Sequence, residues 1–181
     1  MPDALPHFRY HPDPVASGSV EASAAACRSC GRARGWLYVG PVYAEDDLDS
    51  SFCPWCLADG SAAARFDASF IDDAAFDAAL PTATVDELLH RTPGFASVQP
   101  ESWPPCCGDA TAFIGPMGIA ELRRADHTLE GPLMAHIVHG LGISGGAARR
   151  LAESLQRDQS PTLMLFRCRH CEAPHFHVDT P

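Results

Sequence analysis

The chain has 181 residues, 46% of them hydrophobic, which suits one domain or two small ones with a sizeable core and excludes a largely disordered protein. Its formal charge is −10 and all 13 basic residues are arginine, so the clustered cations that bind nucleic acid phosphates are not expected. No apolar run approaches the roughly 18 residues of a membrane span, and residues 1–18 do not resemble a signal peptide. We therefore expect a cytoplasmic protein with no membrane or nucleic acid partner.

Residues 1–26 are rich in proline and alanine. X-Pro steps disfavour helix, so this segment is expected to be an extended arm. Leu5, Phe8 and Tyr10 are the side chains through which the arm could pack on the rest of the chain.

The strongest motif is a pair of C-x-x-C sequences separated by 22 residues, which contributes Cys27, Cys30, Cys53 and Cys56. Disulfides are rare in the cytosol, so clustered cysteines there indicate metal binding. Four thiolates suit the tetrahedral coordination of structural zinc. Free buried thiols and an iron–sulfur cluster are the alternatives.

Residues 27–67 are predicted to form one zinc-finger module. Residues 36–40 have the composition of a strand, and residues 41–52 are expected to contain a turn and a returning strand. Pro54 then suits the first turn of a helix that carries Cys53 and Cys56 at its start. This order of knuckle, hairpin and helix predicts a treble-clef-like finger.

Acidic residues are concentrated between Glu45 and Glu87. This stretch contains eleven of them and a single basic residue, Arg65, so its charge of −10 equals the net charge of the whole chain. Either the stretch is a solvated surface, or it is a docking face for a basic protein partner. The eleven are Glu45, Asp46, Asp47, Asp49, Asp59, Asp67, Asp72, Asp73, Asp77, Asp86 and Glu87.

Residues 68–181 are predicted to form a small mixed α/β part, packed with the finger in one compact α+β unit. Thr84 and Glu87 have the spacing of a capping box, so Thr84 is expected to cap a helix. Helices are expected over residues 69–80, 84–91, 119–125, 131–140 and 147–156, and strands over 111–115, 163–166 and 175–178.

A second cysteine cluster is predicted from a third C-x-x-C sequence, Cys168 and Cys171, joined by Cys107. The fourth ligand stays open among Cys106, His175 and His177. Cys106 directly precedes Cys107, and neighbouring residues of an extended chain point to opposite faces. His175 and His177 share one face of the last strand. A second zinc held on this C-terminal knuckle hairpin is expected.

Two weaker patterns are assigned structural roles. His136 and His139 lie three residues apart on an expected helix, but no acidic motif accompanies them, so a metal role is not preferred. Cys107 and Asp109 could form a reactive pair, although structural use is the preferred interpretation.

The chain resembles the CbrC family of bacterial proteins, which is described by three C-x-x-C motifs. The resemblance rests on LPHFRYHPDP, CRSCG, GWLYVGPVY, CPWCLADGSAAARF, DELLHRTPGF, the run from Trp103 to Gly115, and FRCRHC followed by HVD. It covers nearly all of the chain outside residues 116–160. It implies a family without a known mechanism that is linked to tolerance of a nuclease colicin, and a cysteine where this chain has Thr111.

Two functions follow as hypotheses. The first is a non-catalytic zinc-binding interaction protein of the CbrC type, which would bind a basic protein as a tolerance or immunity factor. The second is a zinc-dependent enzyme in which Cys107, Cys168 and Cys171 leave one coordination position for water. The first is preferred because no general base has convincing spacing.

Overall fold

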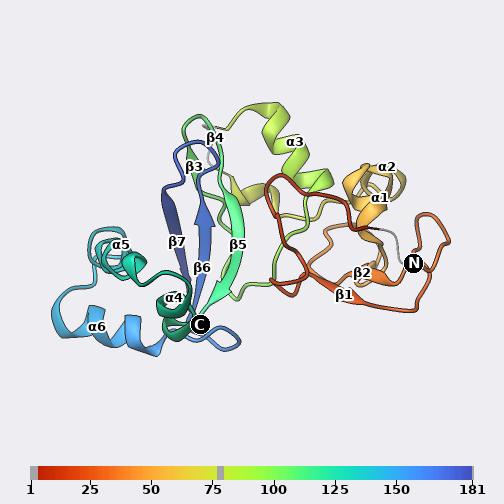
Figure 1. Cartoon of the computed structure of the whole chain (residues 1–181). Coiled ribbons are helices and arrows are strands. Elements are labelled where there is room, and N and C mark those ends of the chain that lie inside the picture. The colour runs from red at the N-terminus through yellow and green to blue at the C-terminus, as the bar shows by residue number, and fades with distance from the viewer. Residues whose placement is uncertain (1–3, 77–79, 181) are drawn as a thin grey trace.

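A three-stranded antiparallel sheet lies at the centre of the protein in this computed structural model, which describes residues 4–76 and 80–180 (Figure 1). Its order is β5 (Ala112–Met117), β6 (Thr162–Arg167) and β7 (Pro174–Asp179). The central strand β6 is buried on both faces, as expected for its unbroken apolar sequence. The predicted C-terminal hairpin is confirmed by the pairing of β6 with β7.

One face of the sheet is covered by helices. Leu163 and Leu165 of β6 pack there against an apolar core that these helices share with Phe176 and Val178. The helices are α4 (Ile119–Asp126), η2 (His127–Leu129), α5 (Glu130–Ala135), the π-helical turn η3 (His136–Gly140) and α6 (Gly145–Ser154). The helices predicted in this region are confirmed, with bounds that differ by a few residues.

The opposite face of the sheet carries a cluster of aromatic side chains. Phe95 stacks on Phe113 with ring centroids 4.1 Å apart, and Phe166 and Trp103 pack against both of them. The Trp103 indole N–H donates to the Thr111 carbonyl at 2.7 Å, so its only polar atom is satisfied inside the core.

The part of the chain that holds the first cysteine group lies on the side of the sheet opposite α4 and α6 (Figure 1). It contains β1 (Val20–Ala22), β2 (Trp36–Tyr38), α1 (Pro54–Ala58) and α2 (Ser61–Phe66). It has its own apolar core, in which Cys27, Cys53 and Cys56 are buried.

Of the returning strand predicted within residues 41–52, the structure has only an isolated antiparallel bridge from Phe52 to Tyr38. β2 pairs instead with β1, which belongs to the segment expected to be an extended arm. Tyr10 and His11 of the same segment are fully buried, so it is part of the folded unit. The treble-clef topology is therefore not established, whereas a mixed helix and sheet fold with two cysteine groups is.

Two helix predictions also need correction. Of the helix expected over residues 69–80, the described part contains only the 3-10 turn η1 (Asp73–Ala75), and residues 77–79 lie outside the described chain. Helix α3 (Thr82–Arg91) is present, but it begins after Pro81 and no side chain caps it. The Thr84 hydroxyl instead donates to Asp109 at 3.3 Å, a tertiary contact that the capping pattern could not reveal.

No helix within residues 4–76 and 80–180 is both long enough and apolar enough to cross a bilayer.

Candidate metal centres

The sulfur atoms of Cys27, Cys30, Cys53 and Cys56 all lie within 4.8 Å of one another. The Cys30 and Cys53 sulfurs are 3.9 Å apart. A tetrahedral zinc ion with Zn–S bonds of about 2.3 Å requires its sulfur ligands to lie about 3.8 Å apart. The spacing of the first group therefore fits a tetrahedral ion.

Local backbone geometry brings these two pairs together. Gly31 has a φ of +72°, which glycine adopts without strain, and its N–H donates to the Cys27 carbonyl at 2.7 Å to close the first knuckle. Cys53 is the N-cap of α1 and Pro54 follows as its first residue, so Cys56 lies one turn further along the helix.

Burial disfavours the charged thiolate form of the cysteines in the first group unless a cation compensates their charge. Cys53 is fully buried, and this burial raises the pKa of its thiol to about 12. The Cys53 backbone N–H donates to the Cys27 sulfur at 3.2 Å, which supplies only a partial positive charge. A bound cation would supply the charge that these buried thiolates need, with release of their protons.

The second group contains Cys106, Cys107, Cys168 and Cys171, whose sulfurs also lie within 4.8 Å of one another. The Cys106 sulfur is 3.8 Å from that of Cys107 and 3.8 Å from that of Cys171. Both distances match the edge of a zinc–thiolate tetrahedron.

Adjacent cysteines point apart only where the chain is extended, and the chain is not extended at Cys107. Cys106 ends β3 (Pro105–Cys106), which pairs with β4 (Asp109–Ala110) in a tight hairpin. Cys107 has a φ of +54° and Gly108 one of +76°, so the chain reverses at this point instead of running extended. The turn directs both neighbouring sulfurs to the same centre.

Backbone hydrogen bonds in the knuckle of Cys168 and Cys171 stabilise the thiolate form of Cys168. The Cys168 sulfur accepts hydrogen bonds from the backbone N–H groups of Cys171 at 3.5 Å and His170 at 3.4 Å. These two donors lower the pKa of Cys168 to about 6, because they stabilise the charged form.

The other candidates for the fourth position do not belong to this group. His175 and His177 line a separate cavity together with His136. Thr111, where the family resemblance implied a cysteine, is buried, and its hydroxyl donates to the Pro104 carbonyl at 2.8 Å. Thr111 therefore supports the loop that carries the cysteines.

Asp109 accepts hydrogen bonds from several distant parts of the chain, and the sequence did not reveal this network. It accepts hydrogen bonds from the Tyr10 hydroxyl at 2.7 Å and from Arg169 at 3.0 Å, besides Thr84. Burial acts to raise the pKa of Asp109, but hydrogen bonds from Tyr10 and the Ala110 amide outweigh it and the pKa is lowered. The structural interpretation of Asp109 thus accounts for all its contacts, and no sequence signal joins positions 10, 84 and 169.

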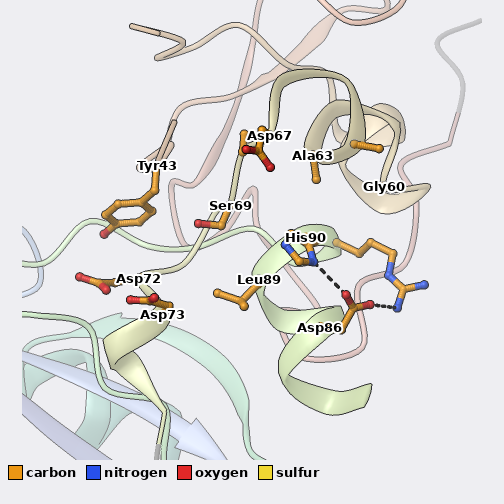
Figure 2. Close-up of a pocket in the computed structure, with 13 residues that line it drawn as sticks. Tyr43, Gly60, Ala63, Asp67, Ser69, Asp72, Asp73, Asp86, Leu89 and His90 are labelled. Carbon is orange, nitrogen blue, oxygen red and sulfur yellow. Dashed lines mark hydrogen bonds and ion pairs between the residues drawn. The ribbon is translucent and has the colours of Figure 1, made fainter. Parts of the chain in front are cut away.

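A cleft of about 710 Å³ lies between α2 and α3 (Figure 2). Asp67, Asp72 and Asp73 line it, and Tyr43 forms part of its wall. Figure 2 also shows Asp86, which forms a hydrogen bond with His90 at 2.9 Å and an ion pair with Arg91 at 3.2 Å. Four acidic residues of the stretch between Glu45 and Glu87 therefore line one cleft.

Comparison with known proteins places the chain in a family. The model of an uncharacterised protein family, UPF0167, matches residues 5–180. The chain belongs to the UPF0167 family. It is 44% identical over 181 residues to the UPF0167 protein PA1536 of Pseudomonas aeruginosa, with 99% of each chain covered. It is 43% identical over 171 residues to the UPF0167 protein Mb2317 of Mycobacterium bovis, covering 94% of this chain and 90% of the relative.

The UPF0167 protein MT2352 of Mycobacterium tuberculosis matches to the same extent. No solved structure gives a significant match. The motifs thus correctly indicated a bacterial-type family without an assigned mechanism, whereas the name CbrC stays a prediction.

Proposed function

We propose that this UPF0167 protein is a non-catalytic, zinc-binding interaction protein that binds a basic segment of a protein partner in the acidic cleft. The observation that carries the proposal is the placement of the cleft: Ala63 of α2 lines it and belongs to the apolar core that contains Cys27, Cys53 and Cys56.

Zinc is supported by the donor sets. Each group offers four sulfurs at tetrahedral spacing, and soft thiolate ligands favour zinc over magnesium or calcium. An iron–sulfur cluster uses the same four ligands and is separated from zinc by its visible absorption and by metal analysis.

A structural role for both ions is supported by ligand number. Four thiolates complete a tetrahedron, which leaves no position for the water that a hydrolytic zinc activates. Since the second group offers Cys106 as well as the three cysteines of the enzyme hypothesis, the proposal assigns all four to one closed site.

A basic occupant of the cleft is supported by its charge. Asp67 and Asp73 are exposed and Asp72 is half-buried, and no described lining residue other than Arg91 and His90 could oppose them. These two are already paired with Asp86. The ring of Tyr43, 39% exposed, offers a face on which an arginine or lysine side chain could lie.

The test compares two triple variants with the same change in net charge. D67N/D72N/D73N removes charge inside the cleft, and E45Q/D46N/D47N removes it from an exposed part of the same stretch. Asn keeps the cap at Asp72, whose side chain accepts from the Ala74 N–H, and it tolerates the positive φ of Asp67. Partners are captured from bacterial lysate at 0.1 M and 0.5 M salt.

We expect the cleft variant to lose basic partners that the wild type and the matched variant retain at low salt, because screening weakens charge pairing. Both variants should keep the same metal content. Equal capture by the two variants would contradict the proposal. The tolerance role implied by the CbrC resemblance has no support in the matched family, so the proposal does not extend to a toxin.

A further inference from the structure

A second cavity, of about 720 Å³, lies at the free edge of the central sheet, along β7. His175 and His177 line it from one face of this edge strand, opposite Phe166 and Met164 of β6, while Phe176 between them packs in the helical core. His136 reaches the same cavity from η3. Three imidazoles from two elements thus share one cavity.

Each of these histidines has an unused nitrogen. The Nε2 atoms of His136, His175 and His177 are shielded from solvent and have no hydrogen-bond partner. Among the described residues, no other buried side-chain nitrogen or oxygen lacks a partner. A buried polar atom without a partner is unfavourable because its lost hydrogen bonds to water are not replaced, so three of them in one place indicate a ligand site.

The protonation state follows from the surroundings. Burial lowers the pKa of all three histidines, and the pKa of His136 is lowered further by His177 and His175. Asp179 opposes the shift at His177 only, and no acidic residue is among the described residues that line the cavity. The imidazoles are therefore neutral at pH 7, and each can present an N–H donor without competition from a nearby carboxylate.

The rest of the wall is mostly apolar, and Gln99 and Ser102 are the other polar residues among the described ones that line it. It includes Trp103, Pro104, Pro105 and, at the rim, Leu141, whose side chain is 42% exposed. Cavities of roughly 300–1,000 Å³ with apolar walls and a few convergent polar groups are the usual form of small-molecule sites. A π-helical turn such as η3 also occurs frequently at functional sites.

The spacing of the three imidazoles argues against a simple metal ion. Within the described residues, only the two cysteine groups have their ligand atoms within 4.8 Å of one another, and the histidines form no third group. An occupant that spans a wider gap and accepts several hydrogen bonds fits better than a single ion.

We propose that this cavity binds a small organic carboxylate with an aryl or alkyl body, whose oxygens accept hydrogen bonds from His136, His175 and His177. The apolar wall around Trp103 holds the body of the ligand. This site is distinct from the acidic cleft: the turn η1 separates the two, since Asp73 lines the cleft and Ala75 lines this cavity, and the proposed ligand has the opposite charge to the proposed partner.

The test is calorimetric titration of the metal-loaded protein with propionate, hexanoate, phenylacetate and 4-phenylbutyrate, alongside phenylacetamide and inorganic phosphate. We expect saturable binding of at least one of the longer carboxylates, and binding at least tenfold weaker for the uncharged amide and for phosphate. The ring-proton NMR signals of the three histidines should shift during the same titration.

Single variants identify the site. H136Q, H175Q and H177Q should each weaken carboxylate binding at least fivefold, while H139Q, on the same π-helical turn and outside the cavity, should leave it unchanged. Metal content and circular dichroism show whether each variant is folded. If a variant does not fold, the NMR titration of the wild-type protein still tests whether the three histidines contact the carboxylate. Absence of saturable carboxylate binding, or saturable nickel binding that the three variants abolish in its place, would overturn the proposal.

Discussion

At the scale of single residues, Cys53 is the side chain on which the first cysteine group most depends. It is fully buried, it begins α1, and its backbone donates to the Cys27 sulfur. We expect Cys53→Ser to lower the bound metal by one ion per chain and the free energy of unfolding by about 3 kcal/mol or more, since metal binding and folding are coupled.

Metal analysis and denaturant unfolding measure these two effects. Cys107→Ser is the matched control, because it removes a thiol from the exposed second group. It should also release one ion but cost much less stability. An unchanged metal content in Cys53→Ser would remove the basis for the first zinc site.

Glu101 should make the stability of the fold depend on pH. It is 6% exposed, and burial raises the pKa of its carboxyl to about 7, although the backbone N–H groups of Asp72 and Phe95 donate to it. Because this pKa is higher in the folded than in the unfolded chain, the folded state binds the proton more tightly. The contribution of Glu101 to stability is therefore greatest below pH 4.5 and falls as the pH rises towards 7.

Glu101→Gln should remove this dependence. We expect the free energy of unfolding of the variant, relative to the wild type, to rise by about 2–3 kcal/mol between pH 5 and pH 8 and then to level off. Unfolding by urea at constant excess zinc measures it, and the difference between the two proteins cancels the common effect of thiol protonation. A difference that does not change with pH would show that Glu101 is ionised throughout.

At the scale of elements, the β3–β4 hairpin shows how a turn determines a metal site. Gly108 has a φ of +76° and nothing lies within 4 Å of the place where a Cβ would be. Gly108→Ala therefore tests backbone strain alone, at a cost of about 1–2 kcal/mol. We expect weaker metal binding at the second group, seen as faster release to a chelator, with the first group unaffected.

Gly131→Ala is the matched control for this prediction. Gly131 lies in the first turn of α5, at an ordinary φ, and a Cβ there also meets open space. It should leave metal release unchanged. If both substitutions had the same effect, the positive φ would not be what positions Cys106 and Cys107.

The differences between the predicted and the observed elements show which features of the fold and of the metal sites the sequence could predict. C-x-x-C spacing identified both cysteine groups, and periodicity located most helices and the last two strands, because these signals are local. The partner of β2 was missed, since a three-residue strand carries almost no pattern and its pairing is decided by packing. The role of Cys106 was left open because a left-handed conformation at Cys107, which is not a glycine, has no sequence signature.

At the scale of the whole molecule, the two cysteine groups differ in burial. Cys27, Cys53 and Cys56 belong to an apolar core, whereas Cys107 and Cys171 are exposed. We expect a chelator to remove two ions per chain in two phases, with the second group emptied first. The slow phase should coincide with loss of the fold around the first group. Metal release followed by a colorimetric chelator checks this, and in Cys107→Ser only the slow phase should remain.

The three tryptophans report on two regions: Trp36 and Trp55 pack against the core that holds the first cysteine group, and Trp103 lies in the aromatic core under the sheet. Trp55 lies between Cys53 and Cys56 in α1, where its indole N–H donates to the Ala4 carbonyl at 3.2 Å and the Arg34 guanidinium lies 4.2 Å from its ring centroid. Trp103 is 1% exposed among the aromatic rings under the sheet. Because solvent relaxation shifts indole emission to longer wavelength, the short-wavelength part of the fluorescence belongs to Trp103. The emission wavelength thus distinguishes opening of the region around the first cysteine group, near Trp36 and Trp55, from unfolding of the whole protein.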